Sequence, residues 1–179
     1  MNNPKPIPQL PAPTANLPIE LESELKIRFQ DCDPFGHLNN GAYINLFINA
    51  REDQLIDQYN FDIYDWSSAT GSGWVVGKHE IVYRRPAHVH EKVKIKSRLM
   101  AFGERNLHVE MAMYNADGTE LKAIMWTYFV HFSVPKKRTV PHVPELMQFF
   151  EAVLNPVSTP SIDARTHEIQ TRLQAAATV

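Results

Sequence analysis

The chain has 179 residues, of which 44% are hydrophobic and 21% charged, which is typical of one domain with a full apolar core. Its formal net charge of -2 at pH 7 supplies no basic field, so nucleic acid is not expected as a partner. The single cysteine, Cys32, excludes an intrachain disulfide, so we expect a cytoplasmic protein. No run approaches the ~18 consecutive apolar residues of a membrane-spanning helix, so we expect no membrane partner.

The N-terminal segment, residues 1–20, is rich in proline. Six of the thirteen prolines fall within residues 1–18. Proline lacks an amide hydrogen and has a fixed φ, so we expect this segment to form an extended arm rather than a helix or a central strand. The same prolines interrupt the apolar core that a secretion signal would need.

A strand and a buried helix are predicted next. From Ser23 onward, Leu25, Ile27 and Phe29 alternate with polar residues, which is the pattern of a half-buried strand. After a polar connection, apolar side chains recur at helical spacing: Tyr43, Ile44, Leu46, Phe47, Ile48, Ala50 and Leu55. These side chains cover so much of the helix that a sheet must wrap around it.

Four more strands are predicted after an irregular stretch at residues 60–73. They cover residues 74–83, 93–99, 107–114 and 121–134, and the sequence Asn-Ala-Asp-Gly at residues 115–118 predicts a hairpin turn. Together these elements form an α+β domain, residues 21–140, with one long helix on an antiparallel sheet. The remaining residues, 141–179, are expected to form a C-terminal helical extension with a weak helical pattern at residues 163–177.

The last of these strands is apolar on both faces. Ala123, Met125 and Phe129 lie on one face, and Ile124, Trp126, Tyr128, Val130 and Phe132 lie on the other. The long helix can cover only one face of the sheet. A short amphipathic helix predicted at residues 143–154 is too small to cover the second face, so we expect two subunits to pair there.

The connection before the long helix, residues 31–40, carries more polar chemistry than a turn needs. Turn formation and helix capping account for Pro34, Gly36 and one asparagine. Two carboxylates and His37 remain beside a helix N-terminus, whose unpaired N–H groups can stabilise an oxyanion. A carboxylate there could attack a carbonyl or activate a water, while the imidazole orients the substrate. Acyl transfer and hydrolysis both use such a set of groups.

The stretch RFQDCDPFGHLNNGAYINLFINAR, residues 28–51, resembles the signature of the 4-hydroxybenzoyl-CoA thioesterase-like branch of the hotdog-fold superfamily, with its D-x-D, G-H and N-N elements. Residues 74–87 resemble the next strand of that family and its Arg-Pro-Ala exit. The resemblance covers residues 21–135 and implies a hotdog fold, in which the antiparallel sheet wraps around the helix. It also implies an acyl-CoA thioesterase that assembles as a homodimer or homotetramer.

The resemblance assigns roles to individual residues. Asp33 is implied to be the catalytic carboxylate, as nucleophile or as general base, with His37 assisting. The backbone N–H groups of Asn40 and Gly41 are implied to bind the oxyanion. The implied substrate-binding residues are Arg105, Asn106, Arg85 and Tyr43, of which the arginines would meet the phosphates of coenzyme A. Coenzyme A is then part of the substrate, and neither a separate cofactor nor a metal is implied.

Two other functions stay open on the sequence. One is the hydrolysis of acyl groups carried on an acyl carrier protein. The other is a hotdog dimer that binds an acyl thioester without turning it over. Release of coenzyme A from a set of acyl-CoA thioesters separates hydrolysis from binding alone.

Overall fold

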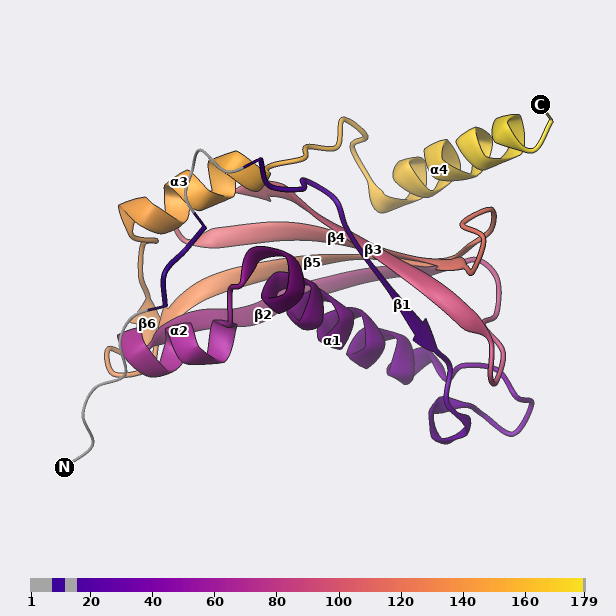
Figure 1. Cartoon of the computed structure of the whole chain (residues 1–179), viewed down its shortest axis with the longest axis horizontal. Helices are drawn as coiled ribbons and strands as arrows, with labels where there is room; N and C mark the ends of the chain where they lie inside the picture. Colours follow the sequence, from indigo (N-terminus) through magenta and orange to yellow (C-terminus); the bar gives the residue numbers. More distant parts are fainter. Residues whose placement is uncertain (1–7, 12–15, 179) are drawn as a thin grey trace.

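The computed structural model of the chain describes residues 8–11 and 16–178, so most of the proline-rich arm predicted at residues 1–20 lies outside the described residues. Within this part, an antiparallel sheet curls around one long helix, α1 (Asn40–Tyr59), which is the predicted α+β architecture (Figure 1). None of the helices in the described part combines the length and the apolar composition that crossing a bilayer requires.

The sheet has six strands among the described residues: β1 (Leu21–Lys26), β2 (Ser72–Tyr83), β3 (Lys92–Phe102), β4 (Asn106–Asn115), β5 (Leu121–Ser133) and β6 (Arg138–Thr139). Five of them follow the order β1-β3-β4-β5-β2 with antiparallel neighbours, and β6 pairs with β5. The four strands predicted after residue 73 are therefore confirmed. Gly118 has a φ of 73°, which lets the predicted turn between β4 and β5 close.

Helix α1 is terminated at both ends by asparagine. Asn39 has extended backbone and its side chain accepts the Gly41 N–H, while Asn60 ends the helix in the left-handed region with a φ of 51°. The buried residues of the helix are Tyr43, Phe47, Ala50, Gln54 and Tyr59. The prediction of a buried helix wrapped by a sheet is confirmed.

One inward position predicted for the first strand is wrong. β1 ends at Lys26, and Phe29 lies in a short 3-10 turn (η1, Phe29–Asp31) where it is 81% exposed. The Cys32 N–H donates to the Phe29 carbonyl at 3.1 Å. This turn breaks the two-residue alternation, so the residues after Ile27 no longer project as strand residues do.

The stretch at residues 60–73, predicted to be irregular, contains a second helix, α2 (Ile63–Thr70). The Asp62 side chain caps its start by accepting two backbone N–H groups, and Gly71 ends it with a φ of 69°. Trp66 is buried in the core at 4% exposure. A helix of eight residues with one buried aromatic side chain has too little periodicity to be distinguished from a loop in the sequence.

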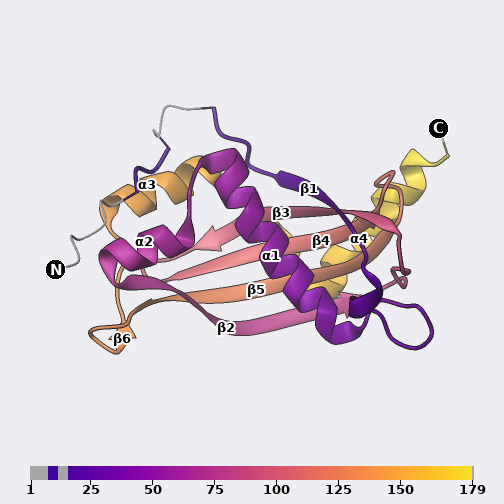
Figure 2. The ribbon, with the colours of Figure 1, turned by 60° about the horizontal axis from the view of Figure 1, so that its bottom comes forward.

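The sheet carries a separate apolar cluster on each face. Figure 2 shows α1 and α4 on opposite sides of the sheet. On one side, Met125 of β5 packs in the cluster that includes α1 and α3 (Pro144–Val153). On the opposite side, Ile124 and Trp126 pack in the cluster that includes α4 (Ile162–Ala176). The strand is thus buried on both faces, as predicted. The expectation that the second face needs another subunit is wrong for these two residues, because α4 covers them.

A buried ion pair attaches α4 to the sheet. Arg165 of α4 is 5% exposed and Glu110 of β4 is 2% exposed. Arg165 Nε and Nη2 each donate to a different carboxylate oxygen of Glu110 at 3.0 Å. Trp126 Nε1 donates to the same carboxylate at 3.0 Å, and Arg98 Nε lies 3.2 Å from it. Both oxygens of this buried carboxylate are therefore engaged, and charge as well as apolar contact fixes α4.

Strand β2 forms a free edge of the sheet. It stands at the end of the strand order, and no described residue pairs with its outer side. Val75 and Val76 are 48% and 47% exposed, and the neighbouring Tyr128 of β5 is 38% exposed. Natural proteins seldom leave a long apolar edge strand open to water. This edge is therefore a candidate contact with a second molecule.

Candidate functional site

The loop between β1 and α1 is closed by its own backbone. The Asp33 N–H donates to the His37 carbonyl at 2.8 Å, and the Gly36 N–H returns to the Asp33 carbonyl at 3.0 Å. Gly36 has a φ of 76°, a conformation that glycine adopts at little cost. The Leu38 N–H donates to the Ala87 carbonyl at 2.8 Å, which ties the loop to the segment after β2. The prediction that Gly36 forms a turn is confirmed, and this turn also orients Asp33.

The carboxylate of Asp33 is held by one of its two oxygens. Its Oδ1 accepts the backbone N–H groups of Phe35 at 2.9 Å and His37 at 3.0 Å. Its Oδ2 has no hydrogen-bond partner in the part of the chain that the structure describes. One oxygen therefore orients the group, and the other is available to a ligand.

The first turn of α1 offers one open N–H group of the predicted pair. The Gly41 N–H donates to Asn39 Oδ1 at 2.9 Å, so the helix cap already uses it. The Asn40 N–H has no acceptor among the described residues, as expected for the first helical position. Of the two donors predicted to bind an oxyanion, only Asn40 has a free N–H in this structure.

A cavity of about 440 Å³ lies beside the helix start. The predicted residues that line it are Asp33, His37, Asn40, Tyr43 and Arg85, and the others are Leu38, Asn39, Tyr83, Arg84 and Pro86. The structure therefore brings five of the eight predicted site residues to one cavity, with Gly41 next to it in sequence. Arginine side chains and a helix N-terminus both suit an anionic ligand.

Two tyrosines line this cavity and contact each other. Tyr43 is 3% exposed, and its hydroxyl accepts the Ala87 N–H at 3.1 Å. Tyr83 packs edge-on against Tyr43, with ring centroids 5.2 Å apart, and donates its hydroxyl proton to the Asn40 carbonyl at 3.0 Å. Sequence reasoning missed Tyr83. Its position as the last residue of β2, directly before Arg84, could have indicated that it lies at the site.

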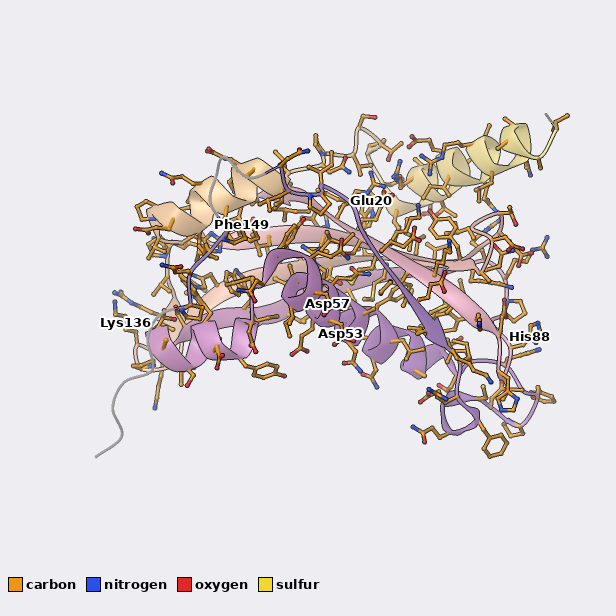
Figure 3. The ribbon with its side chains drawn as sticks, viewed as in Figure 1. Glu20, Asp53, Asp57, His88, Lys136 and Phe149 are labelled. Atoms are coloured by element: carbon orange, nitrogen blue, oxygen red, sulfur yellow. The ribbon has the colours of Figure 1, made fainter. Side chains whose placement is uncertain are left out.

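Arg105 and Asn106 do not lie at this cavity. They follow the end of β3 at Phe102, whereas the start of β3 at Lys92 is near the Asp33 loop. Ten residue steps of ~3.3 Å separate the two ends of this strand by roughly 33 Å. Asn106 closes the hairpin by accepting the Gly103 N–H at 3.0 Å. Figure 3 shows the same separation: His88, which bridges to His37 of the loop, and Lys136 lie at opposite ends of the molecule.

Arg105 lines another cavity, of about 540 Å³, at that far end. Lys136 and Arg138 line it as well, and Arg105 is half exposed, with Glu104 3.7 Å away. His131 also borders this cavity, and its Nε2 is buried without a partner among the described residues. The far cavity thus gathers three cations that suit a polyanion such as a nucleotide phosphate.

No group of three potential metal-ligating side chains occurs among the residues that the structure describes. The two cavities offer a carboxylate, two imidazoles, tyrosines, arginines, a lysine and backbone N–H groups. A carboxylate oxygen and a helix-start N–H at one cavity can attack or hydrate a carbonyl and stabilise the resulting oxyanion.

Comparison with known proteins connects this arrangement to a family. The model of the thioesterase-like superfamily matches residues 27–150, which include the Asp33 loop, α1 and the central strands. The chain is also similar to the long-chain acyl-CoA thioesterase FadM of Escherichia coli (strain K12), with 33% identity over 79 residues. That match covers 44% of this chain and 58% of FadM, which is less than two thirds of its length.

Solved structures share the fold. The 1,4-dihydroxy-2-naphthoyl-CoA thioesterase Slr0204 of Synechocystis superposes with a TM-score of 0.66 at 15% identity, over 75% of this chain and 95% of Slr0204. Protein SAV2348 of Staphylococcus aureus, solved in complex with CoA, superposes with a TM-score of 0.71 at 10% identity, over 86% of this chain and 96% of SAV2348. At these identities the likeness concerns the fold alone.

Proposed function

The chain belongs to the thioesterase-like superfamily, of hotdog fold, and from this premise we propose that it hydrolyses an acyl-CoA thioester at the cavity beside the start of α1. The observation that carries the proposal is the pairing of two open groups at one cavity. These are Oδ2 of Asp33 and the N–H of Asn40. FadM, named a long-chain acyl-CoA thioesterase, supports coenzyme A as the carrier.

In the proposed reaction, the thioester carbonyl oxygen accepts the Asn40 N–H, and the positive end of the α1 dipole faces it. Asp33 then acts through Oδ2, either attacking the carbonyl carbon or removing a proton from the water that attacks it. The carbon–sulfur bond breaks, and coenzyme A leaves as a thiol that takes up the proton. If Asp33 is the general base, the attacking water supplies the hydroxyl of the free acid and the proton of the thiol. If Asp33 is the nucleophile, the thiolate takes its proton from solvent, and water then cleaves the acyl–Asp33 anhydride, which frees the acid and regenerates the carboxylate. His37, on the same wall, orients the substrate.

We also propose that two copies pair through β2. Antiparallel pairing of two β2 strands about a two-fold axis sets the Ser72 end of one strand beside the Tyr83 end of the other. The cavity with Arg105 lies at the Ser72 end, and the cavity with Asp33 lies at the Tyr83 end. Each site then combines the Asp33 loop of one subunit with the partner's Arg105, which supports Arg105 as a contact for the coenzyme A phosphates.

Pairing through β2 predicts the mass of the particle in solution. Light scattering at micromolar concentration should give at least twice the chain mass of 20.5 kDa, and a tetramer would fit as well. Val75→Lys, which places a charge on the exposed edge, should shift the mass toward one chain. A wild-type protein that is a monomer and still hydrolyses acyl-CoA would contradict the shared site.

Arg105→Ala should raise the KM for an acyl-CoA about tenfold and lower kcat much less, because a phosphate contact is remote from the reacting carbonyl. Steady-state kinetics with an acyl-CoA measures both constants. The control is an acyl thioester of N-acetylcysteamine, which lacks the nucleotide and should be insensitive to the substitution. Equal sensitivity of both thioesters would exclude Arg105 as a phosphate contact.

The test of the proposed function is thiol release from short, long and aromatic acyl-CoA thioesters, with acyl carrier protein thioesters in a parallel arm. Hydrolysis of at least one acyl-CoA supports the proposal. Hydrolysis confined to the carrier-protein arm would identify the carrier protein as the partner instead. Binding of acyl-CoA without any thiol release would identify a non-catalytic protein.

A further inference from the structure

A cavity of about 290 Å³ lies between α1, α2, α3 and the inner face of the sheet. Most of its lining is apolar, and Leu55, Trp74, Val109, Phe129 and Phe150 are among the residues that form it. Its α1 wall includes Arg51, which lies eleven residues beyond Asn40, or ~16 Å along the helix. The cavity is thus separate from the one that contains Asp33.

The guanidinium of Arg51 forms no ion pair with any residue that the structure describes. No carboxylate of the described residues lies within ion-pair distance of its guanidinium, and its Nη1 donates to Ser97 Oγ at 3.0 Å. Burial lowers the pKa of Arg51 to about 10, which still leaves it charged at neutral pH. Arg51 is half-buried, and a cation partly withdrawn from water without a partner favours a ligand or an acidic residue that neutralises it.

The polar groups around Arg51 are already satisfied by one another. The Ser97 hydroxyl donates to Gln54 Oε1, and Gln54 Nε2 donates to the Ile95 carbonyl and to Ser23 Oγ at 2.9 Å each. They hold the guanidinium in place and offer it no second acceptor. Guanidinium carries five N–H donors, so most of those on Arg51 have no protein acceptor among the described residues.

The unused donors of Arg51 are open to a ligand. Its Nε and Nη2 have no acceptor among the described residues, yet neither atom is fully buried. Both atoms therefore border open space. The cavity is the space that this residue lines. The other charged residue of the lining, Glu52, is not within ion-pair distance of Arg51. Burial, Asp53 and Asp62 together raise the pKa of Glu52, so the Glu52 carboxyl loses its charge more readily than usual.

From this geometry we propose that the cavity binds the carboxylate of a medium-chain aliphatic acid, with Arg51 as its counter-ion and the apolar walls around its chain. A guanidinium fork matches a carboxylate through two parallel hydrogen bonds. At ~30 Å³ for each water-sized group, the cavity has room for about ten such groups, which sets the length of the chain. The inference does not depend on thioester hydrolysis.

The test is calorimetric titration of the wild-type chain with decanoate, 1-decanol and decylamine, which share one chain length and differ in charge. Decanoate should bind at least about tenfold more tightly than decanol, as a charge-assisted hydrogen bond predicts, and decylamine should bind least. In Arg51→Met, decanoate and decanol should bind with about equal affinity. The decanol affinity should stay within about twofold of the wild-type value, because only the charged group is removed.

The matched control is Arg172→Met, which removes the same charge from an exposed position on α4 and should keep the preference. If Arg51→Met does not fold, the three-ligand series on the wild type decides the question without a variant. Equal affinities for decanoate and decanol would overturn the proposal. So would a decanoate preference that survives in a folded Arg51→Met protein.

A carboxylate can also be carried at the far end of an acyl thioester. A second arm therefore compares displacement of decanoate by decanedioyl-CoA and by decanoyl-CoA. Displacement by the dioyl thioester alone would identify the acyl tail as a source of the carboxylate. If neither thioester displaces decanoate, free acids are the ligand class. Whichever of these two results is found, the proposal is decided by the preference of the wild type for decanoate over decanol.

Discussion

Asp33→Asn is expected to lower kcat for an acyl-CoA by about 10²–10⁴-fold, because a neutral amide can serve neither as nucleophile nor as general base. The substitution preserves the local structure. An asparagine carbonyl oxygen can accept the Phe35 and His37 N–H groups in place of Oδ1, so the loop should keep its shape. Single-turnover and steady-state assays of thiol release, with circular dichroism to verify folding, measure the effect.

Asp31→Asn is the matched control for that variant. Asp31 stands two positions earlier in the same loop and does not line the cavity, and its backbone carbonyl, which accepts the Asn39 N–H at 2.9 Å, is unchanged by the substitution. This variant should keep most of the turnover. If the two variants lose turnover equally, the loop as a whole matters rather than the carboxylate of Asp33. If neither loses it, the role assigned to Asp33 is wrong.

Arg165→Met is expected to lower the free energy of unfolding by about 3–5 kcal/mol, since it removes one partner of a buried ion pair and strands the other. Glu110 would keep Trp126 and Arg98 as partners but lose the bidentate contact from α4. Chemical denaturation followed by tryptophan fluorescence and circular dichroism gives the change.

Two further variants make the stability test specific. Glu168→Gln removes only the exposed pair that Arg165 makes within α4, and should change stability by less than about 0.5 kcal/mol. Adding Glu110→Leu to Arg165→Met should recover much of the loss, because an apolar pair does not strand a charge. A double variant as unstable as Arg165→Met alone would show that packing of α4, rather than the ion pair, governs stability.

Local periodicity explains which parts of the fold could be predicted. The alternation in residues 74–134 and the apolar face of α1 are properties of neighbouring residues, so they were visible in the sequence. Phe29 was misplaced because a 3-10 turn, which begins two residues after Ile27, interrupts the alternation. The role of α4 was missed for two reasons. The apolar periodicity of this helix is weak, and the ion pair that attaches it to β4 joins Arg165 to Glu110, 55 positions earlier in the chain.

The candidate site divides in the same way. Asp33, His37 and Asn40 belong to one loop and one helix start, so a local pattern predicted that they would share a cavity. The contact between Tyr83 and Asn40 spans 43 positions, and that between Arg51 and Ser97 spans 46. Only the register of the sheet brings such residues together, and periodicity carries no information about it. The distance of Arg105 from Asp33 likewise follows from the length of β3.

The position of α1 in the chain has a consequence for protein synthesis. The helix is complete at Tyr59, whereas the last of the strands that enclose it, β5, ends at Ser133. At about 5–20 residues per second, a ribosome needs roughly 4–15 s to make the intervening segment. During that time the sheet that covers the apolar face of the helix is incomplete. A nascent chain stalled before β5 should therefore recruit chaperones at α1, and one stalled after β5 has cleared the exit tunnel should not.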